Sequence, residues 1–247
     1  MTLKNLRLFA LVTILSVVIC SCEKPGVPPD VSPPAPKSPI ELAVGGTAPL
    51  PIAHDGAFYA IRSMNFDSTG VLDTSLMAFA WFGNSDKTES AGKVYLNDSS
   101  LLSNAGNWYT GPSKYYGSEM YWMVEGTEKF PAFQFEDLSE FGSLQSKAIP
   151  PTINRNQGIT ASFNTTGVSA AVIVSVNDSA GHWATKTVGS GLQTVTFTNK
   201  ELATLLVSAK SLVFQIMPVT TNFQTIGSKN YYFVKQASYK KIIWVND

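Results

Sequence analysis

The sequence predicts an all-β protein, with one or two β-sandwich lobes of the immunoglobulin-like kind after a cleavable leader and a proline-rich tether. Three observations lead to this prediction. From Ala57 onward, short segments alternate apolar and polar residues and are bounded by Gly, Asn, Asp and Ser. Nine of the 14 prolines lie between Pro25 and Pro51. The first 22 residues join a basic start to a short apolar run.

The amino-terminal segment has the layout of a secretory signal peptide. Lys4 and Arg7 precede an apolar run of 13 residues, from Leu8 to Cys20. At 1.5 Å per residue this run covers about 20 Å of helix, whereas a bilayer core needs about 30 Å. A basic start, a short apolar run and a small residue before the cut are typical of a leader that is removed. We therefore predict a signal peptide over residues 1–21.

The end of the apolar run, Ile19-Cys20-Ser21-Cys22, resembles the cleavage motif of bacterial lipoprotein precursors. The resemblance covers only residues 1–22. It implies that the thiol of Cys22 receives a diacylglyceryl group, and that the new amino terminus is then acylated. Cys20 is the competing acceptor, but it would place the bulky Ile19 before the cut, where this class prefers Gly, Ala or Ser. An ordinary cleaved signal is the other alternative. No cysteine follows Cys22, so the processed chain cannot form an intrachain disulfide.

The resemblance also implies a location. About three fatty acyl chains attach such proteins stably to a membrane, because each buried methylene contributes about 0.8 kcal/mol. In this class an aspartate directly after the cysteine often retains the protein at the inner membrane. The residue here is Glu23, so we expect a lipid anchor in the outer membrane. The sequence does not distinguish a periplasmic body from a surface-facing one.

Residues 22–42 are predicted to form a stiff, lipidated tether. Proline lacks an amide donor and has a fixed φ, so a stretch this rich in proline favours extended polyproline II. From Glu23 to Pro39 it reaches about 50 Å at about 3.1 Å per residue. A spacer is the simpler interpretation, although proline-rich segments also bind aromatic-lined grooves.

The body is predicted to have two lobes, at 43–150 and 151–247, because Pro150 and Pro151 cannot continue a central strand. The second lobe has the length and turn spacing of an immunoglobulin-like sandwich, which is an analogy of fold only. Thr198 and Glu201 have capping-box spacing and predict one short helix. The segments with a period of two, which predicts strands, are Met77-Phe79-Trp81, Met120-Trp122-Val124, Phe133-Phe135, Val172-Val174-Val176, Val195-Phe197, Leu212-Phe214-Ile216 and Tyr232-Val234.

Composition and motifs exclude several functions. The full chain balances 18 basic against 18 acidic residues, and loss of Lys4 and Arg7 leaves a net charge of −2. With no basic patch visible in the sequence, we expect no nucleic acid partner. His54 and His182 lie in no metal-binding pair, and no Gly-x-Ser-x-Gly elbow occurs. We therefore expect neither a cofactor nor an enzymatic activity.

A carboxylate-based hydrolase is the minor alternative, with the two acids contributed by separate strands. Glu136 and Asp137 are adjacent on a predicted strand and would point to opposite faces. Glu119 and Glu125 would share a face but lie about 20 Å apart at about 3.3 Å per residue. That separation exceeds the spacing that a glycosidase pair needs.

One segment is a weak candidate for calcium. Asn65, Asp67, Thr69 and Asp73, with Gly70 at the sixth position, follow the first nine positions of a calcium loop. The twelfth position is Leu76 rather than a bidentate acid. A plain hairpin loop accounts for the same residues.

The clearest functional signal is a group of aromatic residues between 108 and 122. Trp122 alternates with Met120 and Val124, which predicts a core position. The remaining aromatics offer flat, partly polar surfaces for a sugar ring or a protein partner. The candidate ligand-binding residues are Trp108, Tyr109, Tyr115, Tyr116 and Tyr121.

These observations favour a membrane-anchored envelope lipoprotein with a non-enzymatic binding body that recognises glycan or another envelope component. The alternative is a structural or assembly subunit that docks to an envelope complex through sheet edges. The carboxy-terminal strand predicted at Lys241–Val245 would provide such an edge.

Overall fold

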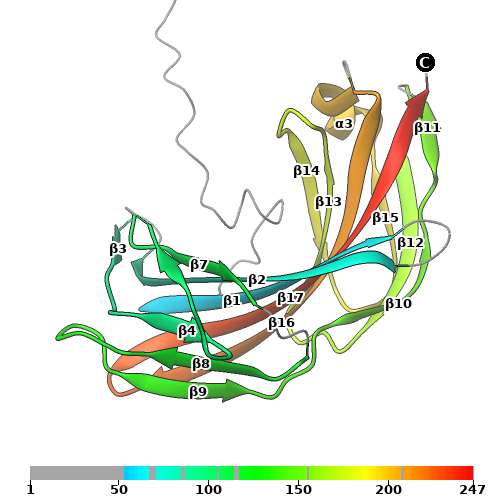
Figure 1. The fold of residues 1–247 in the computed structure, drawn as a ribbon. Helices are drawn as coiled ribbons and strands as arrows, with labels where there is room; N and C mark the ends of the chain where they lie inside the picture. Colours follow the sequence, from blue (N-terminus) through cyan, green and yellow to red (C-terminus); the bar gives the residue numbers. More distant parts are fainter. Residues whose placement is uncertain are drawn as a thin grey trace, which may run out of the picture. The chain divides into compact units, whose positions relative to one another are not determined.

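A computed structural model of the chain describes residues 53–66, 71–84, 87–104, 106–113, 117–154, 156–206 and 209–246. In these ranges the chain forms β-strands and one short α-helix, so the all-β prediction is confirmed. Figure 1 shows the strands as stacked sheets. The predicted signal peptide, Cys22 and the tether lie outside the described residues.

A ten-stranded sheet forms the larger layer. Eight of its strands follow one another in the order β14 (Trp183–Val188), β13 (Ala171–Asn177), β16 (Ser211–Ile226), β17 (Lys229–Asn246), β1 (Gly56–Phe66), β2 (Val71–Asn84), β7 (Tyr109–Pro112) and β6 (Leu102–Ser103). The other two are β11 (Thr152–Asn154), which pairs with β17, and β3 (Lys87–Glu89), which pairs with β2. The neighbours β1 and β17 are parallel, although they come from opposite ends of the body.

Two smaller sheets complete the fold. One has the order β5 (Ser99–Ser100), β4 (Val94–Leu96), β8 (Met120–Val124) and β9 (Phe133–Asp137). The other has the order β10 (Ser143–Ala148), β12 (Ile159–Thr166) and β15 (Gly191–Phe197).

Both smaller sheets pack on the same face of the large sheet. Phe233 belongs to one hydrophobic cluster, with Trp122 of β8, and Ile243 belongs to another, with Phe163 of β12. Because Phe233 and Ile243 are an even number of residues apart on one strand, their side chains point to the same side. The molecule is therefore a double sandwich in which one sheet is shared.

The carboxy-terminal half has immunoglobulin-like connectivity. Its core lies between the sheet β10-β12-β15 and the strands β14, β13, β16 and β17. The chain passes from β12 to β13 and β14 in the facing sheet, returns to β15, and crosses again to β16 and β17. This Greek-key path over three and four strands matches the predicted immunoglobulin-like sandwich.

The strands β16 and β17 form one long antiparallel ribbon that contributes to both sandwiches. The register is constant from the pair Ser211–Trp244 to the pair Ile226–Lys229. The ladder lacks pairs only at Met217 and Pro218, where proline has no N–H to donate. The ribbon follows the predicted boundary at residue 150 in the sequence, yet β17 pairs with β1, which precedes it. The strand β10 also precedes that boundary, yet it pairs with β12, which follows it. The division into lobes at residue 150 stays a prediction of the sequence.

The helix α3 (Asn199–Leu206) begins as predicted. The main-chain N–H of Thr198 donates to Glu201 Oε2 at 2.8 Å, and the N–H of Glu201 donates to the Thr198 hydroxyl at 3.3 Å. This reciprocal pair is the capping box that the sequence indicated. Leu202, Leu205 and Leu206 then bury one side of the helix in the second core.

Candidate functional site

Among the aromatic candidates of segment 108–121 that the structure describes, Trp108 and Tyr109 point to different sides of the sheet. Trp108 is half-buried and packs against Trp81, with the ring centroids 4.9 Å apart. Tyr109 points the other way and is only 1% exposed. Its hydroxyl accepts the main-chain N–H of Ala91 at 2.9 Å. The expectation that Tyr109 faces a ligand is therefore wrong, because its ring and hydroxyl belong to the core.

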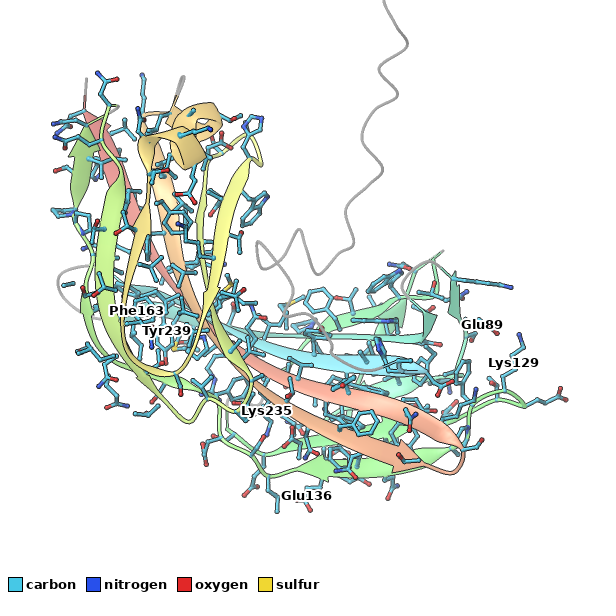
Figure 2. All side chains as sticks on the ribbon, turned by 180° about the vertical axis from the view of Figure 1, so that it is seen from behind. Glu89, Lys129, Glu136, Phe163, Lys235 and Tyr239 are labelled. Atoms are coloured by element: carbon cyan, nitrogen blue, oxygen red, sulfur yellow. The ribbon has the colours of Figure 1, made fainter. Side chains whose placement is uncertain are left out.

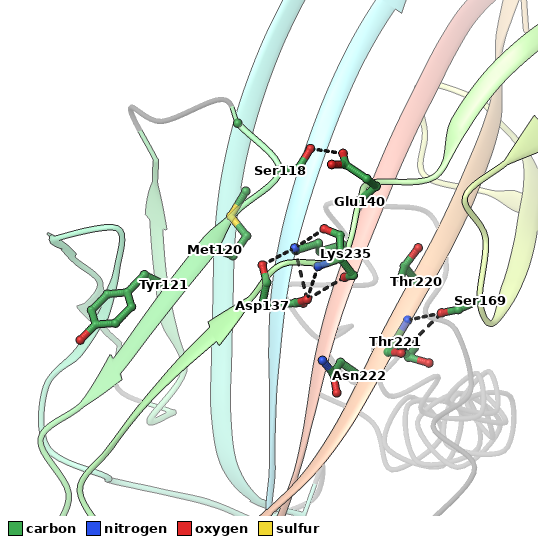
Figure 3. Close-up of polar contacts among 12 residues, drawn as sticks. Ser118, Met120, Tyr121, Asp137, Glu140, Ser169, Thr220, Thr221, Asn222 and Lys235 are labelled. Atoms are coloured by element: carbon green, nitrogen blue, oxygen red, sulfur yellow. Dashed lines mark hydrogen bonds and ion pairs between the residues drawn. The ribbon is translucent and has the colours of Figure 1, made fainter.

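Tyr121 is the remaining aromatic candidate that the structure describes. Tyr121 is half-buried on β8, where its neighbour Met120 is fully buried and points to the opposite side (Figure 3). Tyr115 and Tyr116 lie outside the described residues. Trp122 is a core residue, as predicted, and its ring contacts that of Phe58 edge to face.

The calcium candidate falls on the β1–β2 hairpin. Asn65 and Asp73 face each other in its register, which agrees with the hairpin interpretation. Asp67, Thr69 and the side chain of Asp73 lie outside the described residues, so calcium binding stays a prediction. Within the described ranges, no group of three or more His, Cys, Asp or Glu residues is placed to hold a metal ion.

The adjacent acids Glu136 and Asp137 have different environments. Glu136 is exposed, and Figure 2 shows it at the surface, whereas Asp137 is buried beside Lys235. The two carboxylates therefore point to opposite faces, as predicted. The Nζ of Lys235 lies 3.3 Å from Asp137 Oδ1. Burial lowers the pKa of Lys235, and the Asp137 carboxylate opposes that shift.

A groove lies where the large sheet is locally incomplete. The strand β1 accompanies β17 as far as the pair Asn65–Lys240, and β11 takes over at the pair Thr152–Trp244. In the part of the chain that the structure describes, residues 241–243 of β17 have no strand partner on this side. The resulting notch opens into a cavity of about 900 Å³. Its lining residues are Asn65, Phe66, Lys147, Ala148, Ile149, Pro151, Val213, Lys240, Lys241, Ile242 and Trp244.

The apolar part of this groove is open to solvent. Ile242 and Trp244 are 54% and 57% exposed, two of the few large apolar side chains that the described surface leaves uncovered. They point to the same side of β17, because side chains two residues apart on a strand share a face. The main-chain N–H of Trp244 donates across the notch to Pro151 O at 2.9 Å. The main-chain groups of Ile242, two residues earlier, therefore also point toward the notch.

Three lysines also line the groove. The Nζ of Lys147 lies 3.2 Å from the centroid of the Phe66 ring, a cation–π contact. The Nζ of Lys241 donates to Ile149 O at 2.7 Å. Lys240 is half-buried on the face that it shares with Ile242. Among the described residues, none of the three groove lysines forms an ion pair, whereas Lys93, Lys129, Lys186, Lys229 and Lys235 do.

Within the described residues, no carboxylate forms an ion pair with the three groove lysines. Burial lowers the pKa of Lys147, and the nearby charge of Lys241 lowers it further. Burial alone lowers the pKa of Lys240. An anion in the groove would counter both effects, because an opposite charge stabilises the protonated amine.

The sequence contained a signal for this site that its interpretation missed. Lys240 and Lys241 are adjacent, and they are followed by Ile242 and Trp244 on alternating positions. Lys147, more than ninety residues earlier, joins them only because β10 ends beside β17. The basic cluster therefore exists in space, although the sequence shows no long basic run.

The carboxy-terminal strand is not a free sheet edge. Over the segment Lys241–Val245, β17 pairs with β16 on one side, and β11 pairs with its end on the other. A partner strand could add here only by displacing β11. The predicted docking of an assembly partner to this edge therefore has no open strand to use, apart from the short notch.

Comparison with known proteins gives little further information. No family model matches the chain, and no curated protein matches it. One similar solved structure comes from a study of host cell surface retention by a 1.5-MDa bacterial ice-binding adhesin. The two chains are 15% identical, and the match covers 76% of this chain and 64% of the other chain, with a TM-score of 0.27. A DUF3823 family protein from Bacteroides ovatus ATCC 8483 is 10% identical to this chain. The match covers 74% of this chain and 98% of the other chain, with a TM-score of 0.27. At these TM-scores, neither likeness bears on the function of this chain.

Proposed function

We propose that this protein is a lipid-anchored envelope protein whose β-sandwich body binds a ligand without catalysing a reaction. The observation that supports this proposal is the groove beside β17. It combines an exposed indole and an exposed isoleucine with three lysines that have no acidic partner in the described part of the chain. Soluble domains rarely leave aromatic and aliphatic side chains together in a polar-rimmed hollow unless a ligand covers them.

Three of the described acidic residues are engaged in ion pairs. Asp137 pairs with the buried Lys235. Asp55 and Glu201 pair with Lys229 and Lys186. A carboxylate-based glycosidase needs two acids that flank one substrate position, and none of these three acids lines the groove.

The test uses the whole mature chain, with Cys22→Ser to prevent lipidation. It is applied to an array of purified glycans and envelope polysaccharides. We expect retention on a subset, and we expect Trp244→Ala to abolish it. The matched control is Leu192→Ala, which removes another exposed apolar side chain, 76% exposed on β15 and outside the groove. Equal retention of wild type and Trp244→Ala, or no retention at all, would overturn the proposal.

The anchor needs a separate test. Cells that express the full precursor are labelled with a fatty acid analogue, and the protein is recovered from membrane and soluble fractions. We expect label and membrane association in the wild type and in Cys20→Ala, and neither in Cys22→Ala. Within the described ranges, no helix is long and apolar enough to span a bilayer. An unlabelled wild type released without detergent would contradict the anchor.

A further inference from the structure

We infer that the groove beside β17 binds an acidic saccharide, with a sugar ring against Trp244 and its carboxylate or sulfate between Lys147 and Lys240. This inference rests on the proposed function and names the ligand class for the same site. Three features carry it: the position of the lysines, the exposure of the indole, and the size and backbone polarity of the notch.

The lysines favour an anion. Lys147 and Lys240 have no hydrogen-bond acceptor or ion-pair partner among the described residues. Lys241 donates one of its three N–H groups to Ile149 O. The ammonium groups of Lys147 and Lys241 repel each other, and burial weakens the hydration of Lys147 and Lys240. A bound carboxylate or sulfate would relieve both costs through charge-assisted hydrogen bonds.

The apolar side of the groove favours a ring over a simple ion. Trp244 and Ile242 present their side chains next to the lysines, and a free inorganic anion would leave both uncovered. A sugar ring has an apolar C–H face that lies flat on an indole, while its edge carries hydroxyls. The acidic group and the ring must therefore belong to one molecule.

The notch has the size and polarity for a short oligosaccharide. Its volume of about 900 Å³ lies within the range of about 300–1,000 Å³ that is typical of small-molecule sites. The N–H and C=O of Ile242 point into it and can bind sugar hydroxyls. A nucleic acid would need a longer basic track, because its affinity comes from many phosphate contacts.

The experiment is a titration of the mature Cys22→Ser chain with four probes: a uronic acid oligosaccharide, the same oligosaccharide with its carboxyl groups reduced to alcohols, a sulfated oligosaccharide, and inorganic phosphate. Isothermal calorimetry gives the Kd at low and physiological salt. We expect the uronic acid or the sulfated probe to bind, with an affinity that falls as salt rises. We expect the reduced oligosaccharide to bind about tenfold more weakly, because it loses a charge-assisted contact.

Two variants separate the contributions of charge and ring. Lys147→Gln with Lys240→Gln should weaken the acidic probe about tenfold or more and flatten its salt dependence. Trp244→Ala should weaken both the acidic and the reduced probe. The control is Lys129→Gln, an exposed lysine outside the groove, which should leave every Kd unchanged. Circular dichroism and thermal unfolding verify that each variant is folded.

The outcomes distinguish this inference from the proposed function. If the reduced probe binds as tightly as the acid, the groove is a binding site but the acidic class is wrong. If phosphate alone binds as tightly as the oligosaccharides, the site is a general anion site and the inference fails. If the double lysine variant binds the acid like the wild type, the inference also fails. If no probe binds and Trp244→Ala changes nothing on the array, both proposals fail.

Discussion

Lys235 of β17 and Asp137 at the end of β9 form an ion pair in which the side chains are only 1% and 2% exposed. The Nζ of Lys235 also donates to the main-chain carbonyl oxygens of Asp137, at 2.7 Å, and Ser139. Figure 3 shows these contacts converging on one amine. The pair therefore fixes the chain after β9 to the middle of β17, between the two apolar cores.

Removal of this amine should destabilise the protein strongly. We expect Lys235→Met to lower the free energy of unfolding by about 3–5 kcal/mol, because it leaves the Asp137 carboxylate buried without a counter-charge. The measurement is equilibrium urea unfolding followed by tryptophan fluorescence. The double variant with Asp137→Leu should recover part of the loss.

The matched control for Lys235→Met is Lys129→Met. Lys129 pairs with Glu89 at the surface, as Figure 2 shows, and exposed pairs contribute about 1 kcal/mol or less. Equal losses for the two methionine variants would contradict a special role for the buried pair.

The hydroxyl of Tyr109 is structural. We expect Tyr109→Phe to cost about 1–3 kcal/mol, because the buried N–H of Ala91 loses its acceptor. Ligand retention should be unchanged, since this ring does not line the groove. Tyr121→Phe is the control, and its stability should stay within about 0.5 kcal/mol of wild type. Unfolding in urea and retention on the glycan array check both parts, and a loss of retention in Tyr109→Phe would restore this residue as a ligand contact.

Close packing at Pro218 makes Gly142 hard to replace. A Cβ at Gly142 would lie 2.5 Å from the Cβ of Pro218, so Gly142→Ala should cost about 1–3 kcal/mol through overpacking. At Gly189 nothing lies within 4 Å of an added Cβ. We expect Gly189→Ala to shift the stability by less than about 1 kcal/mol. The comparison uses thermal unfolding, and a harmless Gly142→Ala would show that the ribbon moves easily at Pro218.

The capping box of α3 should make stability depend on pH. The pKa of Glu201 is lowered from 4.5 to about 2. The largest cause is the hydrogen bond from the main-chain N–H of Thr198, and the next are those from Lys186 and from the Thr198 hydroxyl. The stabilisation from this carboxylate is therefore present above pH 4.5 and is lost as the pH falls toward 2. The difference in Tm between wild type and Glu201→Gln should be constant above pH 4.5 and shrink below it. A difference that does not change with pH would contradict this assignment.

Local structure was predictable because its causes lie within a few residues. The alternation of Met120, Trp122 and Val124 gave both the strand β8 and its buried face. Thr198 and Glu201 gave the start of α3. In each case the residue types set the backbone conformation and one face, whatever the distant partners are.

The remaining features depend on which strands pair over long distances. The sequence segments Leu212–Ile216 and Tyr232–Val234 are parts of strands of 16 and 18 residues, because the ribbon serves two cores. The groove exists because β1 ends at one point along β17 and β11 begins at another. No local pattern encodes that gap. The pairing of β7 with β2 explains why Tyr109, which we predicted to bind a ligand, is enclosed by the first core.

The parallel partnership of β1 with β17 has a consequence for biogenesis. Gly56 pairs with Tyr231, so β1 gains its parallel neighbour only once β17 has been synthesised. A chain that emerges amino terminus first exposes the β1–β2 hairpin before that neighbour is present, and contacts so distant in sequence form slowly. Folding is therefore completed only after synthesis of β17, and a premature stop before β17 would leave both sandwiches open along the same seam.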